Sequence, residues 1–261
     1  KIGRTVDYVA GRNRYVGYLI SVASNSYKNL RIGLDCANGA SWMIAKSVFD
    51  ALGAQTVVIG ADPDGFNVNN GYGSTHIEKL CQLVKDQHLD VGFAFDGDAD
   101  RCFAVDENGN CVDGDGMMFV LANRLASRGM LNENTVVATV MSNSGFVASL
   151  KKMGVDCIQT KVGDRFVYEA MQNCNYSLGG EQSGHIILKK YAPTGDGILT
   201  AIMIAEEMCD RKLSLGKLVE PLQLYPQHLI NLRVKDKEAV MQDKGVLAAK
   251  EAVETEIGGK T

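Results

Sequence analysis

Short runs of β-branched and apolar residues alternate with longer helical patterns along most of the chain. Residues 31–36, 55–60 and 90–95 have the pattern of strands, and residues 41–53 and 73–87 have the pattern of helices. Two parallel strands need a crossover connection of about a dozen residues or more, which is usually a helix. The alternation therefore predicts an α/β fold with mostly parallel sheets. Ser74 or Thr75 is the expected N-cap of the second helix.

A hairpin and a second series of the same kind follow. Residues 101–112 predict a hairpin around Asn108 and Gly109. The elements expected after it are helices at 114–130, 144–154, 163–173 and 194–210, strands at 134–141 and 155–160, and a bent pair of strands within 176–188. We expect two consecutive, similar α/β domains with mixed, mostly parallel sheets.

The pattern changes at both ends of the chain. Residues 11–22 predict an amphipathic helix before the first strand. After Pro221 and Pro226, residues 228–234 resemble a strand and residues 237–256 a helix. These outer segments are expected to be parts of flanking domains.

Charge and cysteine usage exclude several classes of protein. The 261 residues carry a formal net charge of −4, which predicts neither nucleic acid nor an anionic membrane as a partner. No apolar run approaches the roughly 20 residues of a membrane span, and no signal peptide is visible. The seven cysteines are scattered and never form a C-x-x-C pair, which indicates free thiols in a reducing cytoplasm.

Three carboxylates crowd into the segment "FDGDADR" between two apolar runs. Asp96, Asp98 and Asp100 lie two residues apart, so their oxygens can converge on one hard cation such as Mg²⁺, with Arg101 beside them for a phosphate oxygen. An EF-hand is one alternative, since Glu107 is correctly spaced, but Arg101 occupies the position that requires glycine. A phosphatase with an aspartyl nucleophile and a solvated acidic turn are the others.

A second polar segment, Gly180–His185, lies between two apolar strands. Glu181, Ser183 and His185 alternate, so their side chains can share one side and suit the hydroxyls of a sugar, with His185 near a phosphate. The alternative is a polar hairpin tip without a ligand.

The stretch "KVGDR" lies between a strand and a helix. Lys161, Arg165 and free backbone N–H groups there could hold an anion; the alternative is a surface helix start with Asp164 as cap. Asn38–Gly39 and Asn67–His76 are interpreted as structural loops.

Taken together, "FDGDADR", "KVGDR" and "GGEQSGHIIL…TGDG" resemble, in order and spacing, the α-D-phosphohexomutase superfamily. "NVNNGYGSTH" is similar to a stretch in the branch that acts on an amino sugar, although Tyr72 replaces a frequent cysteine. Ala99 replaces a frequent glycine, a change expected to be harmless to the three aspartates. The resemblance implies four domains around one cleft. It assigns 1–29 to the tail of the first domain, 30–110 to the second, 111–224 to the third and 225–261 to the opening of the fourth.

The resemblance also implies roles for individual residues. It makes the three aspartates Mg²⁺ ligands and makes the polar residues of the second segment readers of the sugar. The implied set is Asp96, Asp98 and Asp100 for the metal, Glu181 and Ser183 for sugar hydroxyls, Arg101 and His185 near the substrate or the transferred phosphoryl group, and Lys161 and Arg165 for substrate binding.

The implied activity is the interconversion of glucosamine 6-phosphate and glucosamine 1-phosphate. It proceeds through an enzyme phosphoserine and a glucosamine or glucose 1,6-bisphosphate, and it supplies UDP-N-acetylglucosamine for cell-wall precursors. The alternatives are a relative acting on mannose or glucose phosphates, and a module that binds Mg²⁺ or a sugar phosphate without catalysis. The serine loop and the final phosphate loop of the superfamily are not found in the sequence. We therefore expect a fragment that does not catalyse the reaction by itself.

Overall fold

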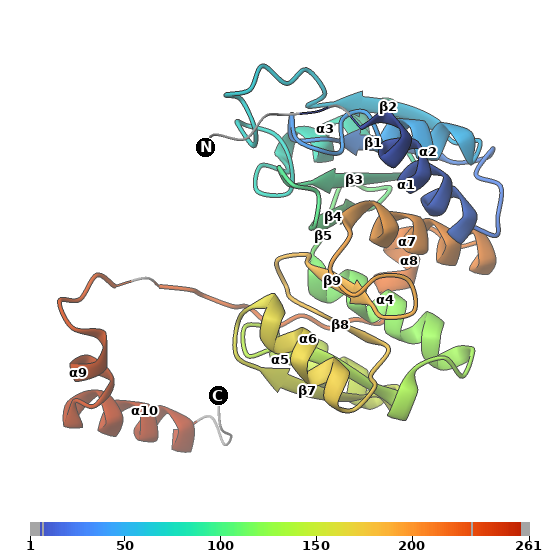
Figure 1. Ribbon diagram of the computed structural model, residues 1–261. Coiled ribbons are helices and arrows are strands. Elements are labelled where there is room, and N and C mark those ends of the chain that lie inside the picture. Colours follow the sequence, from blue (N-terminus) through green and yellow to red (C-terminus); the bar gives the residue numbers. More distant parts are fainter. Residues whose placement is uncertain (1–5, 7, 231, 257–261) are drawn as a thin grey trace. The chain divides into compact units, whose positions relative to one another are not determined.

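The fold contains two β-sheets, and the first four strands of each sheet have the same order and directions (Figure 1). The first has the order β2-β1-β3-β4-β5 and the second β7-β6-β8-β9, and in both the first three strands are parallel and the next is antiparallel. This confirms the expected mixed sheets. The strands are β1 (Arg31–Asp35), β2 (Gln55–Ile59), β3 (Val91–Phe95), β4 (Cys102–Val105), β5 (Cys111–Val112), β6 (Thr135–Thr139), β7 (Asp156–Thr160), β8 (Leu178–Gly180) and β9 (Ile186–Leu188).

The computed structural model describes residues 6, 8–230 and 232–256. The chain divides into one unit up to Tyr225, which contains both sheets, and a second from Pro226 onward. The helices of the first unit are α1 (Val9–Val22), α2 (Ala45–Ala51), α3 (Glu78–Gln87), α4 (Gly114–Ser127), α5 (Ser144–Lys152), α6 (Asp164–Asn173), α7 (Gly197–Arg211) and α8 (Leu215–Val219).

Helices α4 and α7 lie between the two sheets. Helix α7 contacts β3 and β4 of the first sheet and β9 of the second, and α4 contacts β4 and β8. One core cluster therefore contains residues of both sheets, including Phe93, Ala104, Val136 and Leu178. The outer faces have separate small cores, one under α3 and one under α6.

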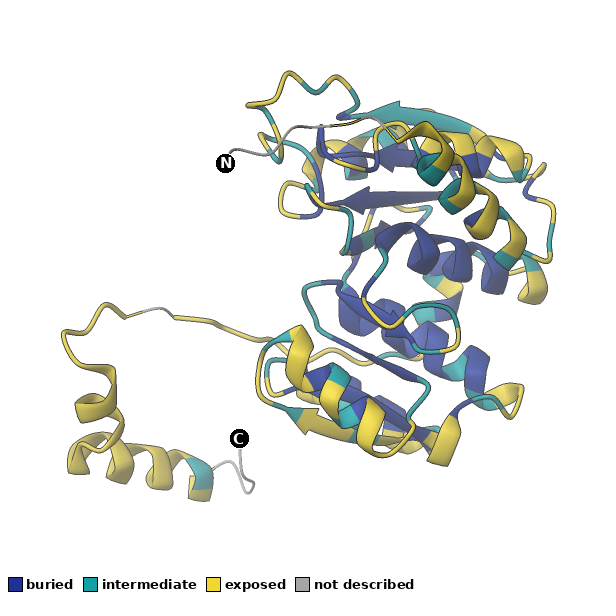
Figure 2. Cartoon of the chain, viewed as in Figure 1, coloured by how far each residue is buried: buried dark blue, intermediate teal, exposed yellow. Residues whose placement is uncertain are grey.

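Their position explains why α4 and α7 are buried almost all round, as the dark colour of both helices in Figure 2 shows. A helix that packs against sheets on two sides needs apolar residues around most of its circumference, which runs such as "MMFVLA" and "ILTAIMIA" supply.

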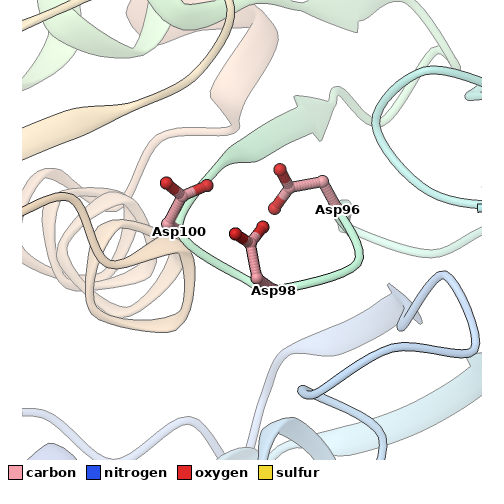
Figure 3. Close-up of side chains that lie close together, drawn as sticks. All are labelled: Asp96, Asp98 and Asp100. Atoms are coloured by element: carbon pink, nitrogen blue, oxygen red, sulfur yellow. The ribbon is translucent and has the colours of Figure 1, made fainter. Parts of the chain in front are cut away.

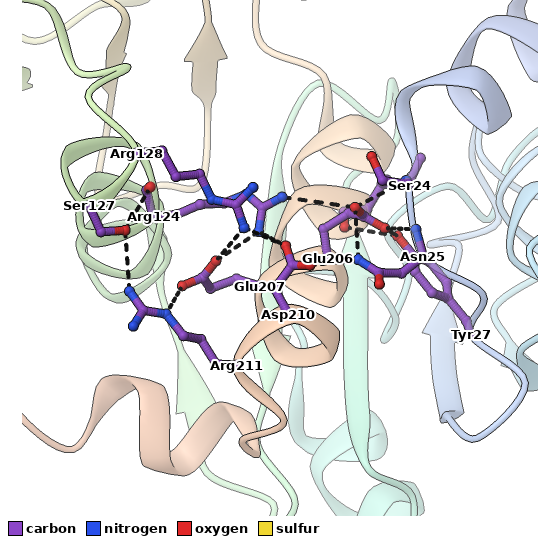
Figure 4. A network of polar contacts seen from close by, with 11 residues as sticks. Ser24, Asn25, Tyr27, Arg124, Ser127, Arg128, Glu206, Glu207, Asp210 and Arg211 are labelled. Carbon is purple, nitrogen blue, oxygen red and sulfur yellow. Dashed lines mark hydrogen bonds and ion pairs between the residues drawn. The ribbon is translucent and has the colours of Figure 1, made fainter.

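Several of the exceptions are charged groups that pair with one another (Figure 4). Arg124 of α4 lies 2.7 Å from Glu207 and 2.6 Å from Asp210, both of α7. Glu206, which is 1% exposed, accepts hydrogen bonds from the backbone N–H of Asn25 at 3.0 Å and from the hydroxyl of Tyr27 at 3.1 Å. The network joins α4, α7 and the segment that precedes β1.

Three expected helix starts were wrong. Helix α2 begins at Ala45 rather than at Ser41, and residues 41–44 form turns. Helix α3 begins at Glu78, and its N-cap Ile77 makes no side-chain cap; Ser74 instead donates its backbone N–H to the carbonyl of Phe95 at 2.9 Å, which keeps it in the preceding loop. Helix α7 begins at Gly197 rather than at Thr194, because the Asp196 side chain accepts the N–H of Leu199 and caps the helix there.

The second unit contains α9 (Lys237–Met241) and α10 (Lys244–Glu256), within the range expected to be helical. Of the strand expected at 228–234, Asn231 lies outside the described residues. The expectation was wrong for the others, because they form no strand in the structure. A strand requires hydrogen-bond partners for its backbone groups.

Candidate metal and sugar site

The two polar segments occupy equivalent places in the two sheets and meet in the structure. The acidic loop (residues 96–101) connects β3 to β4, and the polar turn (residues 181–185) connects β8 to β9, which are the corresponding strands. Arg101 and His185 form an antiparallel bridge, and Cys102 donates its N–H to the carbonyl of Gly184 at 3.1 Å. Backbone pairing thus joins the two loops at the boundary between the sheets.

The three aspartates of the acidic loop converge (Figure 3). One carboxylate oxygen of each of Asp96, Asp98 and Asp100 lies within 4.8 Å of the others. Burial raises the pKa of Asp96 to about 6, and the neighbouring charges of Asp100 and Asp98 add to the rise, although the N–H of Arg101 partly opposes it. Three hard oxygen donors that repel one another fit a divalent cation such as Mg²⁺.

Arg101 follows the cluster directly. Its Nε lies 3.8 Å from Asp96 and 3.9 Å from Asp100, and its side chain is 45% exposed. The guanidinium therefore offsets part of the negative charge while keeping donors available to an anion.

Flanking loops shape the base of the acidic loop. Ala40 donates its N–H to the carbonyl of Gly97 at 2.8 Å, and a Cβ on Gly39 would lie 2.3 Å from that same oxygen. Residues 67–76 pack against it from the other side, where a Cβ on Gly97 would lie 2.6 Å from Val68. Asn38–Gly39 and Asn67–His76 thus contact the loop through backbone and packing.

In the polar turn, Glu181 is held by the stretch "KVGDR". The N–H of Gly163, the N-cap of α6, donates to Glu181 Oε1 at 3.0 Å, so the anion bound at this helix start is a side chain of the protein itself. Ser183 Oγ lies 3.5 Å from Glu181 Oε2. Lys161 and Arg165 are exposed, and Arg165 pairs with Glu169 at 2.7 Å.

A cavity of about 450 Å³ opens beside both loops. Arg101, Glu181 and Ser183 contribute to its lining, which brings these three predicted residues together. The residues of the lining that sequence reasoning missed are Phe103, Asp113, Thr139, Met141, Val162 and Gln182. The position of Thr139 and Met141 at the carboxyl end of the parallel strand β6 is a signal that could have found them, because ligands bind at such ends.

His185 is 3% exposed, and its ring lies between the acidic loop and the segment "TGDG". Its Nδ1 is 3.0 Å from Asp100 Oδ2, and its Nε2 accepts the N–H of Gly195 at 3.2 Å. The segment "TGDG" supplies this amide and also Gly197, which donates its N–H to the carbonyl of Ala99 at 2.9 Å.

Replacing Ala99 by glycine is expected to raise the free energy of unfolding by about 1 kcal/mol. Ala99 has φ +62°, a left-handed conformation in which a Cβ is strained and glycine is not. Urea unfolding of the two proteins measures the change. Ala148→Gly, in the middle of α5, is the matched control and should lower stability by about 1 kcal/mol. A loss of stability for Ala99→Gly would contradict the strain argument.

Two domain models of one family match the chain. They are "Phosphoglucomutase/phosphomannomutase, alpha/beta/alpha domain II" over residues 13–109 and "alpha/beta/alpha domain III" over residues 113–225. The chain therefore belongs to the phosphoglucomutase/phosphomannomutase family, and the resemblance to phosphohexomutases is confirmed.

Within this family the chain is similar to proteins named phosphoglucosamine mutase. It is 54% identical to that of Lachnospira eligens over 257 residues, which are 98% of this chain and 57% of that protein. It is 45% identical to that of Bacillus subtilis over 258 residues, 99% of this chain and 58% of that protein. The chain thus spans somewhat more than half the length of these relatives.

Solved structures share the fold. A phosphoglucomutase/phosphomannomutase family protein from Burkholderia thailandensis matches with a TM-score of 0.72 at 24% identity, covering 81% of this chain and 46% of that one. N-acetylphosphoglucosamine mutase of Aspergillus fumigatus, solved with GlcNAc-6P and magnesium, matches with a TM-score of 0.69 at 15% identity, covering 87% of this chain and 53% of that one. Across the described residues, no helix combines the length and apolar character needed to cross a membrane.

Proposed function

We propose that the chain forms the metal-binding and sugar-binding part of a phosphoglucosamine mutase. The reaction would interconvert glucosamine 6-phosphate and glucosamine 1-phosphate through an enzyme phosphoserine and a 1,6-bisphosphate. The observation that carries the proposal is the junction of the two loops: the partly exposed Arg101 lines one cavity with Glu181 and Ser183, and the three convergent carboxylates belong to the same loop as Arg101. The 54% identity to a phosphoglucosamine mutase supports the amino sugar as substrate.

Each group has a role that follows from its chemistry. Asp96, Asp98 and Asp100 would hold Mg²⁺, which when bound polarises phosphoryl oxygens and offsets their charge. Arg101 would bind a phosphate oxygen. Glu181 would accept a hydrogen bond from a sugar hydroxyl at Oε2, since the N–H of Gly163 already donates to Oε1. Ser183 would form a hydrogen bond with a neighbouring hydroxyl. Positioning and charge neutralisation account for most catalysis of phosphoryl transfer.

Lys161 and Arg165 lie at the margin of this arrangement. As exposed cations beside the Gly163 turn, they are proposed to attract the phosphate of an incoming substrate rather than to bind it at the centre. The domain boundaries at 29, 110 and 224 stay part of the proposal.

Replacing Asp98 by asparagine is expected to weaken Mn²⁺ binding by the 261-residue chain at least about tenfold, or 1.4 kcal/mol. The change removes one charged donor from the cluster of three. Electron paramagnetic resonance of free Mn²⁺, with Mg²⁺ as competitor, measures the affinity. Asp86→Asn, an equal charge change on exposed α3, should leave it unchanged. Equal affinities for the Asp98 variant and the native chain would place the cation elsewhere.

The substrate is tested by turnover of the longest product that the gene encodes, with Mg²⁺ and a trace of glucose 1,6-bisphosphate. We expect kcat/KM for glucosamine 1-phosphate to exceed the values for glucose and mannose 1-phosphates about a hundredfold, or about 2.7 kcal/mol. EDTA should abolish turnover. Comparable or better use of the neutral sugars would overturn the amino-sugar assignment and leave the metal site in place.

A further inference from the structure

The hydrogen bonds of His185 define which of its ring nitrogens carries a proton. The backbone N–H of Gly195 can only donate, so Nε2, 3.2 Å away, must offer its lone pair. In the neutral ring the proton is then on Nδ1, which lies 3.0 Å from Asp100 Oδ2. His185 therefore donates to Asp100, with an orientation fixed by the main chain of another segment.

One face of the ring is closely covered by the main chain of Gly195. A Cβ on Gly195 would lie 2.6 Å from Cε1 and 2.7 Å from each ring nitrogen of His185, so the ring packs flat against a residue without a side chain. The backbone of His185 is also held, by the bridge to Arg101 and by the N–H of Glu181, which donates to its carbonyl at 2.9 Å. The donor is thus buried and fixed on both sides.

Asp100 needs such a partner more than its neighbour Asp96 does. Its side chain is 36% exposed, whereas that of Asp96 is 12% exposed and accepts the N–H of Arg101 at 3.2 Å. An exposed carboxylate among like charges would rotate toward solvent unless a hydrogen bond held it.

We propose that His185 is a positioning residue for the metal site. Its Nδ1–H fixes the carboxylate of Asp100 toward Asp96 and Asp98, and so connects the polar turn and "TGDG" to the acidic loop. This role rests on the proposed metal site and differs from a direct contact of His185 with the substrate. Hydrogen-bond partners of metal ligands typically contribute a factor of about 10–100 to metal affinity.

Two variants distinguish the hydrogen bond made by Nδ1 of His185 from the one made by Nε2. His185→Asn places an amide N–H near the Nδ1 position and keeps the donor to Asp100, whereas His185→Gln reaches the Nε2 position and loses it. In the 261-residue chain, we expect His185→Gln to weaken Mn²⁺ binding about tenfold or more, and His185→Asn to stay within about threefold of the native chain. Thermal unfolding of both variants reports any loss of packing.

The outcomes decide between separate claims. Equal weakening by both variants, in step with equal losses of Tm, would make His185 a packing residue and overturn the inference. Mn²⁺ affinity unchanged in His185→Gln would also overturn it and leave the proposed function standing. A native chain that binds no Mn²⁺ would overturn the metal site and this role together. If the variants fail to fold, ¹⁵N NMR of His185 in the native chain decides: protonated Nε2 would overturn the inference, and protonated Nδ1 would support it.

Discussion

Replacing Arg124 by methionine is expected to lower the free energy of unfolding by about 3–5 kcal/mol. The Arg124 side chain is 6% exposed and faces Glu206 and Glu207, whose side chains are 1% and 2% exposed. Methionine fills similar space but leaves Glu206 buried without a cation, and leaves Glu207 with only the more exposed Arg211 at 2.9 Å and Arg128 at 3.8 Å. Asp210 loses a partner as well: burial raises its pKa, but hydrogen bonds from Asn25, Arg124 and Arg128 outweigh that effect and lower it to about 2.

Urea unfolding at neutral pH measures the loss, and Arg128→Met is the matched control. Arg128 lies one helical turn further along, also pairs with Asp210, and has a side chain that is 41% exposed, so its removal should lower stability by less than about 1 kcal/mol. Similar losses for the two variants would contradict the view that burial decides the importance of the pairing. The double variant Arg124→Met/Glu207→Gln should recover part of the loss, because it removes a buried carboxylate that has lost one of its cations.

Replacing Gly114 by alanine is expected to lower the free energy of unfolding by about 1–3 kcal/mol. Gly114 is the first residue of α4, and its N–H donates to the carbonyl of Gln182 at 3.0 Å. A Cβ there would lie 2.1 Å from the carbonyl oxygen of Glu181 and 2.7 Å from the nitrogen of Gly184. These are backbone atoms of the polar turn, so the turn itself would have to move.

The same change in open space should act in the opposite direction. Gly17 lies inside the exposed part of α1, with nothing within 4 Å of a Cβ, so Gly17→Ala should raise stability by about 0.5–1 kcal/mol. Urea unfolding of both variants tests the pair. In the Gly114 variant we also expect weaker binding of the sugar phosphate, since Glu181 would be displaced. Stability within error of the native chain would show that the turn can yield without strain.

Local pattern predicted the fold well where the chain repeats a simple rule. Strands such as 31–36 and 90–95 lie close to their expected ranges, because a buried parallel strand leaves a short apolar run that is visible in the sequence. Helix starts were harder to predict where a hydrogen bond to a distant segment holds the expected N-cap residue in a loop. Serine is a favoured N-cap residue, yet Ser74 lies in the loop before α3, where its N–H donates to the carbonyl of Phe95 in β3.

The acidic loop was visible because its three aspartates are close in sequence, whereas other contacts of the site join distant segments. No spacing rule connects His185 to Asp100, a pair that forms only when both sheets are in place, or Gly163 to Glu181, which follow different strands of the second sheet. The motif "TGDG" contributed to the family resemblance, but no physical role for it followed from the sequence. The structure shows that Gly195 packs against the ring of His185.

The late position of α7 in the sequence affects how the first sheet folds during synthesis. It is among the last elements of the larger unit to be made, yet it covers β3 and β4 of the sheet that is made first. While the ribosome is still producing residues 114–196, Phe49 of α2 can already stack on Phe93, but the part of the sheet that α7 covers stays exposed to chaperones or to aggregation. The first sheet therefore cannot mature as a separate nascent domain, and its completion waits for α7 to emerge.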